Sequence, residues 1–202
     1  MQNLPSGLKH FPGLLKETTQ TTLLEEIREK TVQAPLFIPR MPKTGKAMSV
    51  RMTNFGGLGW VTDKENGYRY QAHHPETGEP WPKIPQILID IWNSHSGYSK
   101  IPEACLVNFY EPDAKMGMHQ DRDEQNFNAP VLSVSLGDDC LFRYGGTKRN
   151  DPTKSFRLQS GDVMLLSDES RLIFHGVDRI YPGTSTLLKR EGRINLTLRR
   201  VA

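Results

Sequence analysis

Apolar residues recur with a helical period in two stretches of the first half of the chain. Residues 22–32 place Leu23, Leu24 and Ile27 on one side, after threonines that can cap a helix. Residues 82–95 repeat apolar positions at steps of three and one, and Gly97 follows as a stop signal. Both stretches are therefore predicted to be helices that bury one side.

From residue 104 onward the period changes to two, which is typical of strands. Leu132, Val134 and Leu136 alternate with serines, and Gly137 ends the run. Further short strands are predicted between turn signals, at residues 140–144, 155–158, 162–166, 172–174 and 193–200. Many short strands at near-regular spacing indicate a sandwich, barrel or jelly roll. With the helices on one side, the sequence predicts an α+β fold built on an antiparallel β core.

Composition narrows the class of protein. The chain has 202 residues, which fits one domain, and 36% are hydrophobic, which is enough for one core. No apolar run approaches the ~18 residues that span a bilayer, and the first residues do not resemble a secretory signal. Two cysteines are too few for a disulfide scaffold. We expect a cytoplasmic protein without a membrane partner, and the net charge of +3 permits a nucleic-acid partner without requiring one.

The segment His119-Gln120-Asp121 is a candidate metal site. In an extended chain, side chains two residues apart point to the same side, so the imidazole and the carboxylate would converge. His175, which follows an apolar stretch, is a candidate third ligand. Two histidines and one carboxylate form the facial triad of non-haem Fe(II) oxygenases. A surface histidine beside a salt-bridging aspartate would give the same letters, so both interpretations stand at this point.

Polar residues also alternate along the last predicted strand. One face carries Arg193, Asn195, Thr197 and Arg199, and the other face is apolar. Asn108 and Tyr110 repeat this pattern shortly before His119. A solvated face would explain one such strand. If both polar faces instead point into a barrel, the buried arginines need an anionic partner, and a small dicarboxylate such as 2-oxoglutarate would suit them.

These residues together resemble the AlkB family of Fe(II)/2-oxoglutarate-dependent dioxygenases. Residues 108–124 fit the family around its His-x-Asp motif, and residues 193–199 fit its R-x-N-x-T-x-R pattern. Further matches lie at residues 52–60, 130–137, 145–152 and 169–176. The matches cover roughly residues 35–200 in order, which is far more specific than any single motif. The bacterial members of the family are the most similar.

The resemblance implies a double-stranded β-helix, or jelly roll, as a core at about residues 104–200. It also implies flanking N-terminal helices and a nucleotide-recognition lid at about residues 40–80, within a single domain of residues 1–202. Iron would be held by residues that match His119, Asp121 and His175. The carboxylates of 2-oxoglutarate would bind residues that match Arg193 and Arg199, assisted by Asn108, Tyr110 and Asn195.

The same resemblance implies how a substrate base would be held. Trp60 would stack on an extruded base opposite His119, and Tyr68 would contact a phosphate. Asp123 would contact an adenine amino group, and Arg149 would lie on the base side. An aromatic platform near a carboxylate suits a flat, cationic methylated base, which gains stacking, charge attraction and a hydrogen bond together.

The resulting hypothesis is a monomeric DNA repair enzyme that demethylates bases such as 1-methyladenine and 3-methylcytosine. Its substrate would be single- or double-stranded DNA, or RNA, and it would use Fe(II), 2-oxoglutarate and O2 and release formaldehyde, succinate and CO2. A hydroxylase of a protein or small molecule would share the iron and cosubstrate residues but would not need Trp60, Tyr68 and Asp123. A non-catalytic β-barrel binding module is the third alternative, and the intact His-x-Asp motif with His175 argues against it.

Overall fold

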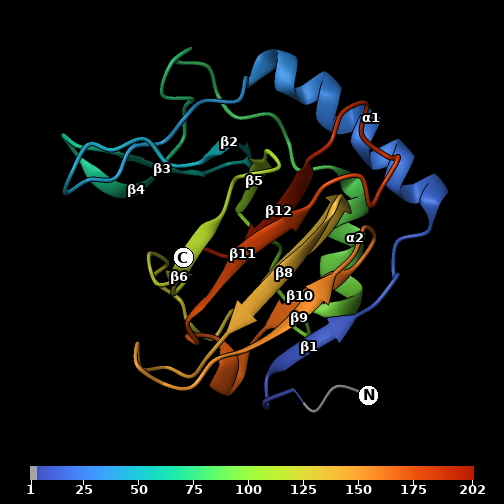
Figure 1. Cartoon of the computed structure of the whole chain (residues 1–202). Coiled ribbons are helices and arrows are strands. Elements are labelled where there is room, and N and C mark those ends of the chain that lie inside the picture. Colours follow the sequence, from blue (N-terminus) through green and yellow to red (C-terminus); the bar gives the residue numbers. More distant parts are fainter. Residues whose placement is uncertain (1–3) are drawn as a thin grey trace.

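Two antiparallel sheets face one another in the computed structural model, which describes residues 4–202 (Figure 1). The large sheet has the strand order β1-β10-β7-β12-β5-β2, and the small sheet has the order β6-β11-β8-β9. The large sheet consists of β1 (Leu8–Phe11), β2 (Val50–Gly56), β5 (Ala104–Tyr110), β7 (Val131–Gly137), β10 (Val163–Leu166) and β12 (Arg193–Arg199). The small sheet consists of β6 (Met116–His119), β8 (Asp139–Tyr144), β9 (Lys154–Leu158) and β11 (His175–Tyr181). The predicted α+β jelly-roll fold is confirmed.

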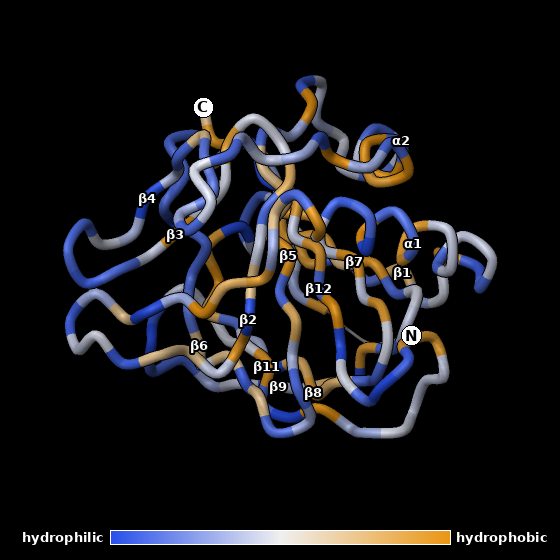
Figure 2. The backbone as a smooth tube through the Cα atoms, turned by 90° about the horizontal axis from the view of Figure 1, so that it is seen from above, coloured by the Kyte–Doolittle hydropathy of each residue, from blue (hydrophilic) through white to orange (hydrophobic). Residues whose placement is uncertain are grey.

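Two apolar clusters divide the core between the two faces of the large sheet. One cluster lies between the sheets and includes Met52 and Phe142. The other includes Leu23, Trp92 and Leu196, and joins the large sheet to the two helices α1 (Glu17–Gln33) and α2 (Gln86–His95). Figure 2 shows both helices on the outer side of the large sheet, away from the small one. Burying one leucine on that side stabilises the fold by roughly 1.5–3 kcal/mol.

This division decides where the polar face of β12 points. Ile194, Leu196 and Leu198 all belong to the cluster beneath the helices. Because successive side chains of a strand point to opposite faces, the alternate positions of β12, residues 193, 195, 197 and 199, face the space between the sheets. The alternation predicted from the sequence is confirmed, and the polar face is turned inward.

Both predicted helices form, but each begins elsewhere than expected. Helix α1 starts at Glu17, and the residue before it, Lys16, caps it without a side-chain hydrogen bond. Thr21 and Thr22 therefore lie inside the helix, where each hydroxyl donates to the carbonyl four residues earlier. Helix α2 starts only at Gln86, because Pro85 occupies the position before it, and the prolines favour an extended chain up to that point.

One predicted strand is wrong. Residues 172–174 lie outside the strands, and strand β11 begins at His175 instead. A 3-10 turn, η1 (Asp168–Ser170), precedes them, and Phe174 pairs only with the backbone of Gly145 and Gly146. The sequence does not predict strand β11, because its register shifts between Val177 and Arg179 and breaks the period of two. The other predicted strands, including residues 193–200, match the observed ones to within one residue at each end.

A hairpin of β3 (Gly59–Asp63) and β4 (Gly67–Gln71) projects from the two sheets (Figures 1 and 2). Buried side chains from outside the hairpin fix its base by hydrogen bonds to the backbone of both strands. The Asn54 side chain exchanges two hydrogen bonds of 3.0 Å with the backbone of Trp60, and Trp81 donates from Nε1 to the carbonyl of Gln71. The hairpin lies within the region where the sequence predicts a lid. Among residues 4–202, no helix is long and apolar enough to cross a membrane.

Candidate active site

A cavity of about 1000 Å³ lies between the two sheets and the β3–β4 hairpin. Polar residues of β5 and β12 form one wall, and residues of β6 and β11 form the facing wall. All of the site residues predicted from the sequence line this cavity: Trp60, Tyr68, Asn108, Tyr110, His119, Asp121, Asp123, Arg149, His175, Arg193, Asn195 and Arg199. Residues from six separate segments of the chain therefore meet in one cavity.

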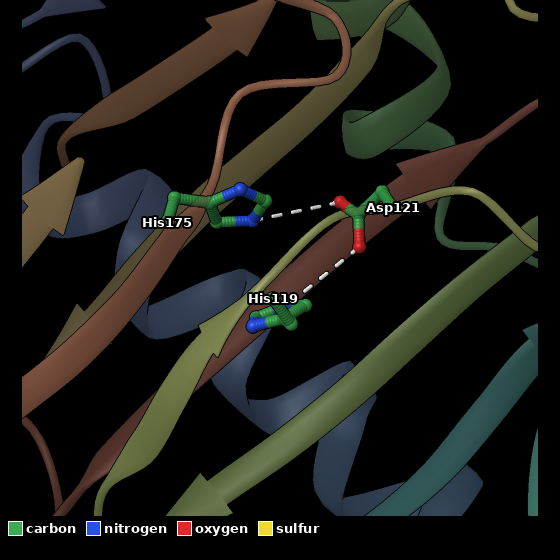
Figure 3. A group of neighbouring side chains, drawn as sticks. All are labelled: His119, Asp121 and His175. Atoms are coloured by element: carbon green, nitrogen blue, oxygen red, sulfur yellow. Dashed lines mark ion pairs between the residues drawn. The ribbon is translucent and has the colours of Figure 1, made fainter. Parts of the chain in front are cut away.

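Three candidate metal ligands converge inside this cavity. His119 on β6 and His175 on β11 are direct partners across an antiparallel ladder, and Asp121 follows two residues after His119. Each histidine Nε2 lies 3.7 Å from one carboxylate oxygen of Asp121 (Figure 3). The candidate ligand atoms all lie within 4.8 Å of one another, which is a separation that a single ion can bridge. Two imidazoles and one carboxylate are the donor set that suits non-haem Fe(II) and leaves positions open.

Hydrogen bonds orient both imidazoles for this role. Nδ1 of His119 lies 2.9 Å from the carbonyl of Gly117, and Nδ1 of His175 lies 3.2 Å from that of Ile173. A carbonyl only accepts hydrogen bonds, so each Nδ1 carries a proton, and in the neutral ring Nε2 keeps its lone pair. This is the tautomer that binds a metal through Nε2.

The charge states of the cluster also suit metal binding. Burial alone would raise the pKa of Asp121, but Arg199 and the two histidines hold it well below its usual range. Burial, together with the neighbouring His119, lowers the pKa of His175 to about 4. At neutral pH the carboxylate is therefore ionised and the buried imidazole is neutral, as ligands must be.

Arg193 is a buried cation that has no carboxylate partner in the described part of the chain. Its side chain donates to Ser135 Oγ at 2.5 Å and to the carbonyl of Asp138 at 3.2 Å. Only 1% of Arg193 is exposed to solvent, so its charge is not compensated by water. A buried charge of this kind is costly without a counter-ion, and an anion entering the cavity would relieve that cost.

Unpartnered polar atoms gather at the same cavity. Among residues 4–202, four buried side-chain atoms lack a hydrogen-bond partner, and three of them belong to cavity residues: Nε of Arg193, Nε of Arg199 and Oδ1 of Asn108. Asn108 and Tyr110 stand directly opposite Asn195 and Arg193 across the β5–β12 ladder. The unpartnered Nε groups of the two arginines fit a ligand with two carboxylates, such as 2-oxoglutarate.

The predicted base-side residues lie where the cavity opens to solvent. Trp60 and Tyr68 stack with ring centroids 5.5 Å apart, and Trp60 donates from Nε1 to Asp123 at 2.7 Å. Arg149 lies 5.6 Å above the ring of Phe174. The Asp123 carboxylate is thus engaged by Trp60 in this arrangement, so a base that used it would displace or share that hydrogen bond.

Sequence reasoning assigned no role to three residues beside the metal ligands, Tyr70, Glu124 and Arg171. The side chain of Glu124 is completely buried and contacts both Arg171 and Arg199. Tyr70 reaches the same carboxylate from the hairpin. Glu124 lies three residues after Asp121, but nothing in the local pattern indicates that a glutamate in an irregular segment is buried.

Comparison with known proteins gives concordant matches. Residues 7–199 match the 2OG-Fe(II) oxygenase superfamily. An alpha-ketoglutarate-dependent dioxygenase AlkB homolog from Caulobacter vibrioides is 52% identical over 96% of this chain and 87% of its own length. The alpha-ketoglutarate-dependent dioxygenase AlkB of Escherichia coli is 42% identical over 88% of this chain and 83% of its own. The solved structure of OsALKBH1 superimposes with a TM-score of 0.83 at 30% identity, covering 98% of this chain and 99% of that one.

Proposed function

Because the chain belongs to the 2OG-Fe(II) oxygenase superfamily, we propose that its cavity serves the oxidative demethylation of N-alkylated bases in nucleic acid. The enzyme uses Fe(II), 2-oxoglutarate and O2. When bound, these supply hydroxylation of the methyl group, which leaves as formaldehyde, with succinate and CO2 as coproducts. One observation carries the proposal: a single cavity combines the histidine–carboxylate cluster, two buried arginines and an aromatic platform beside a carboxylate.

The inner residues hold the reactive groups in place. His119, Asp121 and His175 would bind the iron. His119 on β6 pairs with His175 on β11, and Asp121 follows β6 by two residues, so the three side chains define one place in the cavity. The two arginines would hold the carboxylates of 2-oxoglutarate, and Asn108, Tyr110 and Asn195, which line the same cavity, would help to orient it. This placement is the contribution of the protein, because the cofactor carries the chemistry and the residues fix its geometry toward the methyl group.

The outer residues select the base. Trp60 and Tyr68 offer aromatic surface to an extruded base, Asp123 attracts a cationic ring, and Arg149 lies beside it. A methyl group on the Watson–Crick edge prevents pairing, so it lowers the cost of extruding that base. The substrates that fit are 1-methyladenine and 3-methylcytosine in single- or double-stranded DNA, with RNA as the second candidate.

Charge distribution supports a nucleic-acid partner. Residues 40–70 contain six basic and two acidic residues, although the whole chain has a net charge of only +3. The excess positive charge of the protein is therefore concentrated in the segment that contains the hairpin. Basic residues near a cavity mouth attract the phosphate backbone and steer it toward the site.

The proposal extends to the organisation of the enzyme. We propose that residues 1–202 act as one dioxygenase domain and as a monomer, with the lid at about residues 40–80 and the catalytic core at about residues 104–200. A cytoplasmic location is also proposed, and it agrees with two buried cysteines that are both free thiols.

The experiment that tests the function is formaldehyde release from methylated single-stranded oligonucleotides, with iron and 2-oxoglutarate omitted in turn. An unmethylated oligonucleotide of the same sequence is the matched control. Formaldehyde should form only when the methyl group, iron and cosubstrate are all present. Succinate formation without formaldehyde from any methylated oligonucleotide would favour a hydroxylase that acts on a protein or small molecule.

A further inference from the structure

A compact cluster of buried polar side chains lies beside the proposed iron site, and two of its members, Glu124 and Tyr70, have no part in the function described above. Its centre is the Glu124 carboxylate, whose side chain is completely buried. One oxygen of Glu124 accepts from Arg171 Nη2 at 3.0 Å. The other oxygen accepts from the Tyr70 hydroxyl and from Arg199 Nη1, the latter at 3.3 Å. Two carboxylates, Asp121 and Glu124, thus balance two arginines.

These contacts fix the orientation of Arg199. Its Nη2 donates to Asp121 Oδ1 at 2.6 Å, and its Nη1 donates to the Tyr70 hydroxyl at 3.1 Å as well as to Glu124. Only Nε remains buried without a partner. Because a guanidinium group is planar and rigid, fixing two of its nitrogens also fixes the direction of the third.

Glu124 gives Arg199 a second negative partner, in addition to Asp121. Asp121 is the carboxylate proposed to bind iron, so its charge is shared between a metal ion and Arg199. The buried carboxylate of Glu124 still balances the positive charge of Arg199 when Asp121 also binds a metal ion. The Tyr70 hydroxyl donates a hydrogen bond to the Glu124 carboxylate. Burial raises the pKa of Tyr70, so the phenol stays protonated.

The cluster also connects two parts of the molecule. Tyr70 lies on β4 of the hairpin, Glu124 lies in the segment after β6, and Arg199 ends β12. The Tyr70 hydroxyl donates to Glu124 and accepts from Arg199, so one direct hydrogen bond joins the hairpin to this arginine. A change in the position of β4 therefore acts on Arg199 without passing through the substrate.

We propose that Glu124 and Tyr70 are positioning residues, which hold Arg199 ready for the cosubstrate and thereby couple the β3–β4 hairpin to 2-oxoglutarate binding. The inference rests on the cosubstrate role of Arg199 proposed above. It adds two residues to the machinery and states a reciprocal relation: cosubstrate binding orders the hairpin, and an ordered hairpin favours cosubstrate binding.

The test compares Tyr70→Phe and Glu124→Gln with Tyr181→Phe, which removes a phenol hydroxyl at the end of β11, outside the cavity lining. Calorimetry measures the affinity of the Mn(II)-loaded protein for 2-oxoglutarate, with no oligonucleotide present. Tyr70→Phe should weaken binding roughly tenfold, as the loss of a hydrogen bond to a charged group predicts, and Glu124→Gln should weaken it at least as much. Tyr181→Phe should bind like the unmodified protein.

Hydrogen exchange of residues 59–71 provides the second measurement. Addition of 2-oxoglutarate should slow exchange in the unmodified protein, and Tyr70→Phe should abolish this response even at saturating cosubstrate. Unchanged cosubstrate affinity in folded Tyr70→Phe, or an equal loss in Tyr181→Phe, would overturn the proposal. If Glu124→Gln fails to fold, Tyr70→Phe decides the question. Because neither measurement uses nucleic acid, a protein that fails to demethylate bases can still pass this test.

Discussion

At the scale of single residues, Asp121 has two partners that compete for one negative charge, Arg199 and the proposed iron. Asp121→Asn keeps the size of the side chain and removes that charge. We expect iron retention to fall by more than the roughly 10–100-fold that changes outside the ligand shell cause, and turnover to fall with it. Metal analysis of the dialysed protein, beside circular dichroism, is the measurement. A folded variant that retains iron would contradict the ligand assignment.

Replacing Arg193 should weaken 2-oxoglutarate binding without reducing the stability of the protein. Arg193→Met removes the cation proposed to bind one carboxylate, so 2-oxoglutarate affinity should fall by about 3 kcal/mol, or roughly 100-fold. The same change removes an uncompensated buried charge, so the cosubstrate-free protein should be as stable as before or more stable. Calorimetry and urea unfolding on one preparation measure both quantities. A large loss of stability with unchanged affinity would make Arg193 a structural residue.

At the scale of elements, the β3–β4 hairpin carries the proposed base platform but contributes no metal ligand. Trp60→Ala should weaken binding of a methylated oligonucleotide by ~1–3 kcal/mol, because one stacking surface is lost. Succinate formation in the absence of oligonucleotide should stay the same. Trp60→Phe keeps an aromatic ring and should recover most of the affinity. If Trp60→Ala loses both activities equally, Trp60 is a packing residue rather than a base platform.

The elements differ in how well the sequence predicts them. Strand β12 alternates strictly between apolar and polar residues, so both its existence and its inward polar face follow from its period. Strand β11 contains a register shift, and the sequence singles out only its first residue, His175. The Glu124 cluster could not be predicted, since its members come from β4, an irregular segment and β12. The period of a strand indicates which of its side chains are buried. It does not indicate which distant segments of the chain pack together.

At the scale of the whole molecule, His175 makes stability depend on pH. The unfolded chain takes up a proton near pH 6.5, whereas burial lowers the pKa of folded His175 to about 4. Between these two pH values the unfolded state binds more protons than the folded state. The free energy of unfolding should therefore fall as the pH falls, by up to about 3 kcal/mol. Above pH 6.5 this group should have no effect on stability. Urea unfolding of iron-free protein and of His175→Gln across this range measures the difference. Equal slopes in both proteins would contradict the prediction.

The central claim is that one cavity places a methylated base beside iron and 2-oxoglutarate. Mass spectrometry of an oligonucleotide containing one 1-methyladenine, with succinate measured in the same reaction, tests it most directly. We predict that the methylated base becomes adenine, that one succinate forms for each base repaired beyond the amount formed without oligonucleotide, and that Asp121→Asn yields neither product. An unchanged oligonucleotide in a reaction that consumes 2-oxoglutarate at full rate would contradict it.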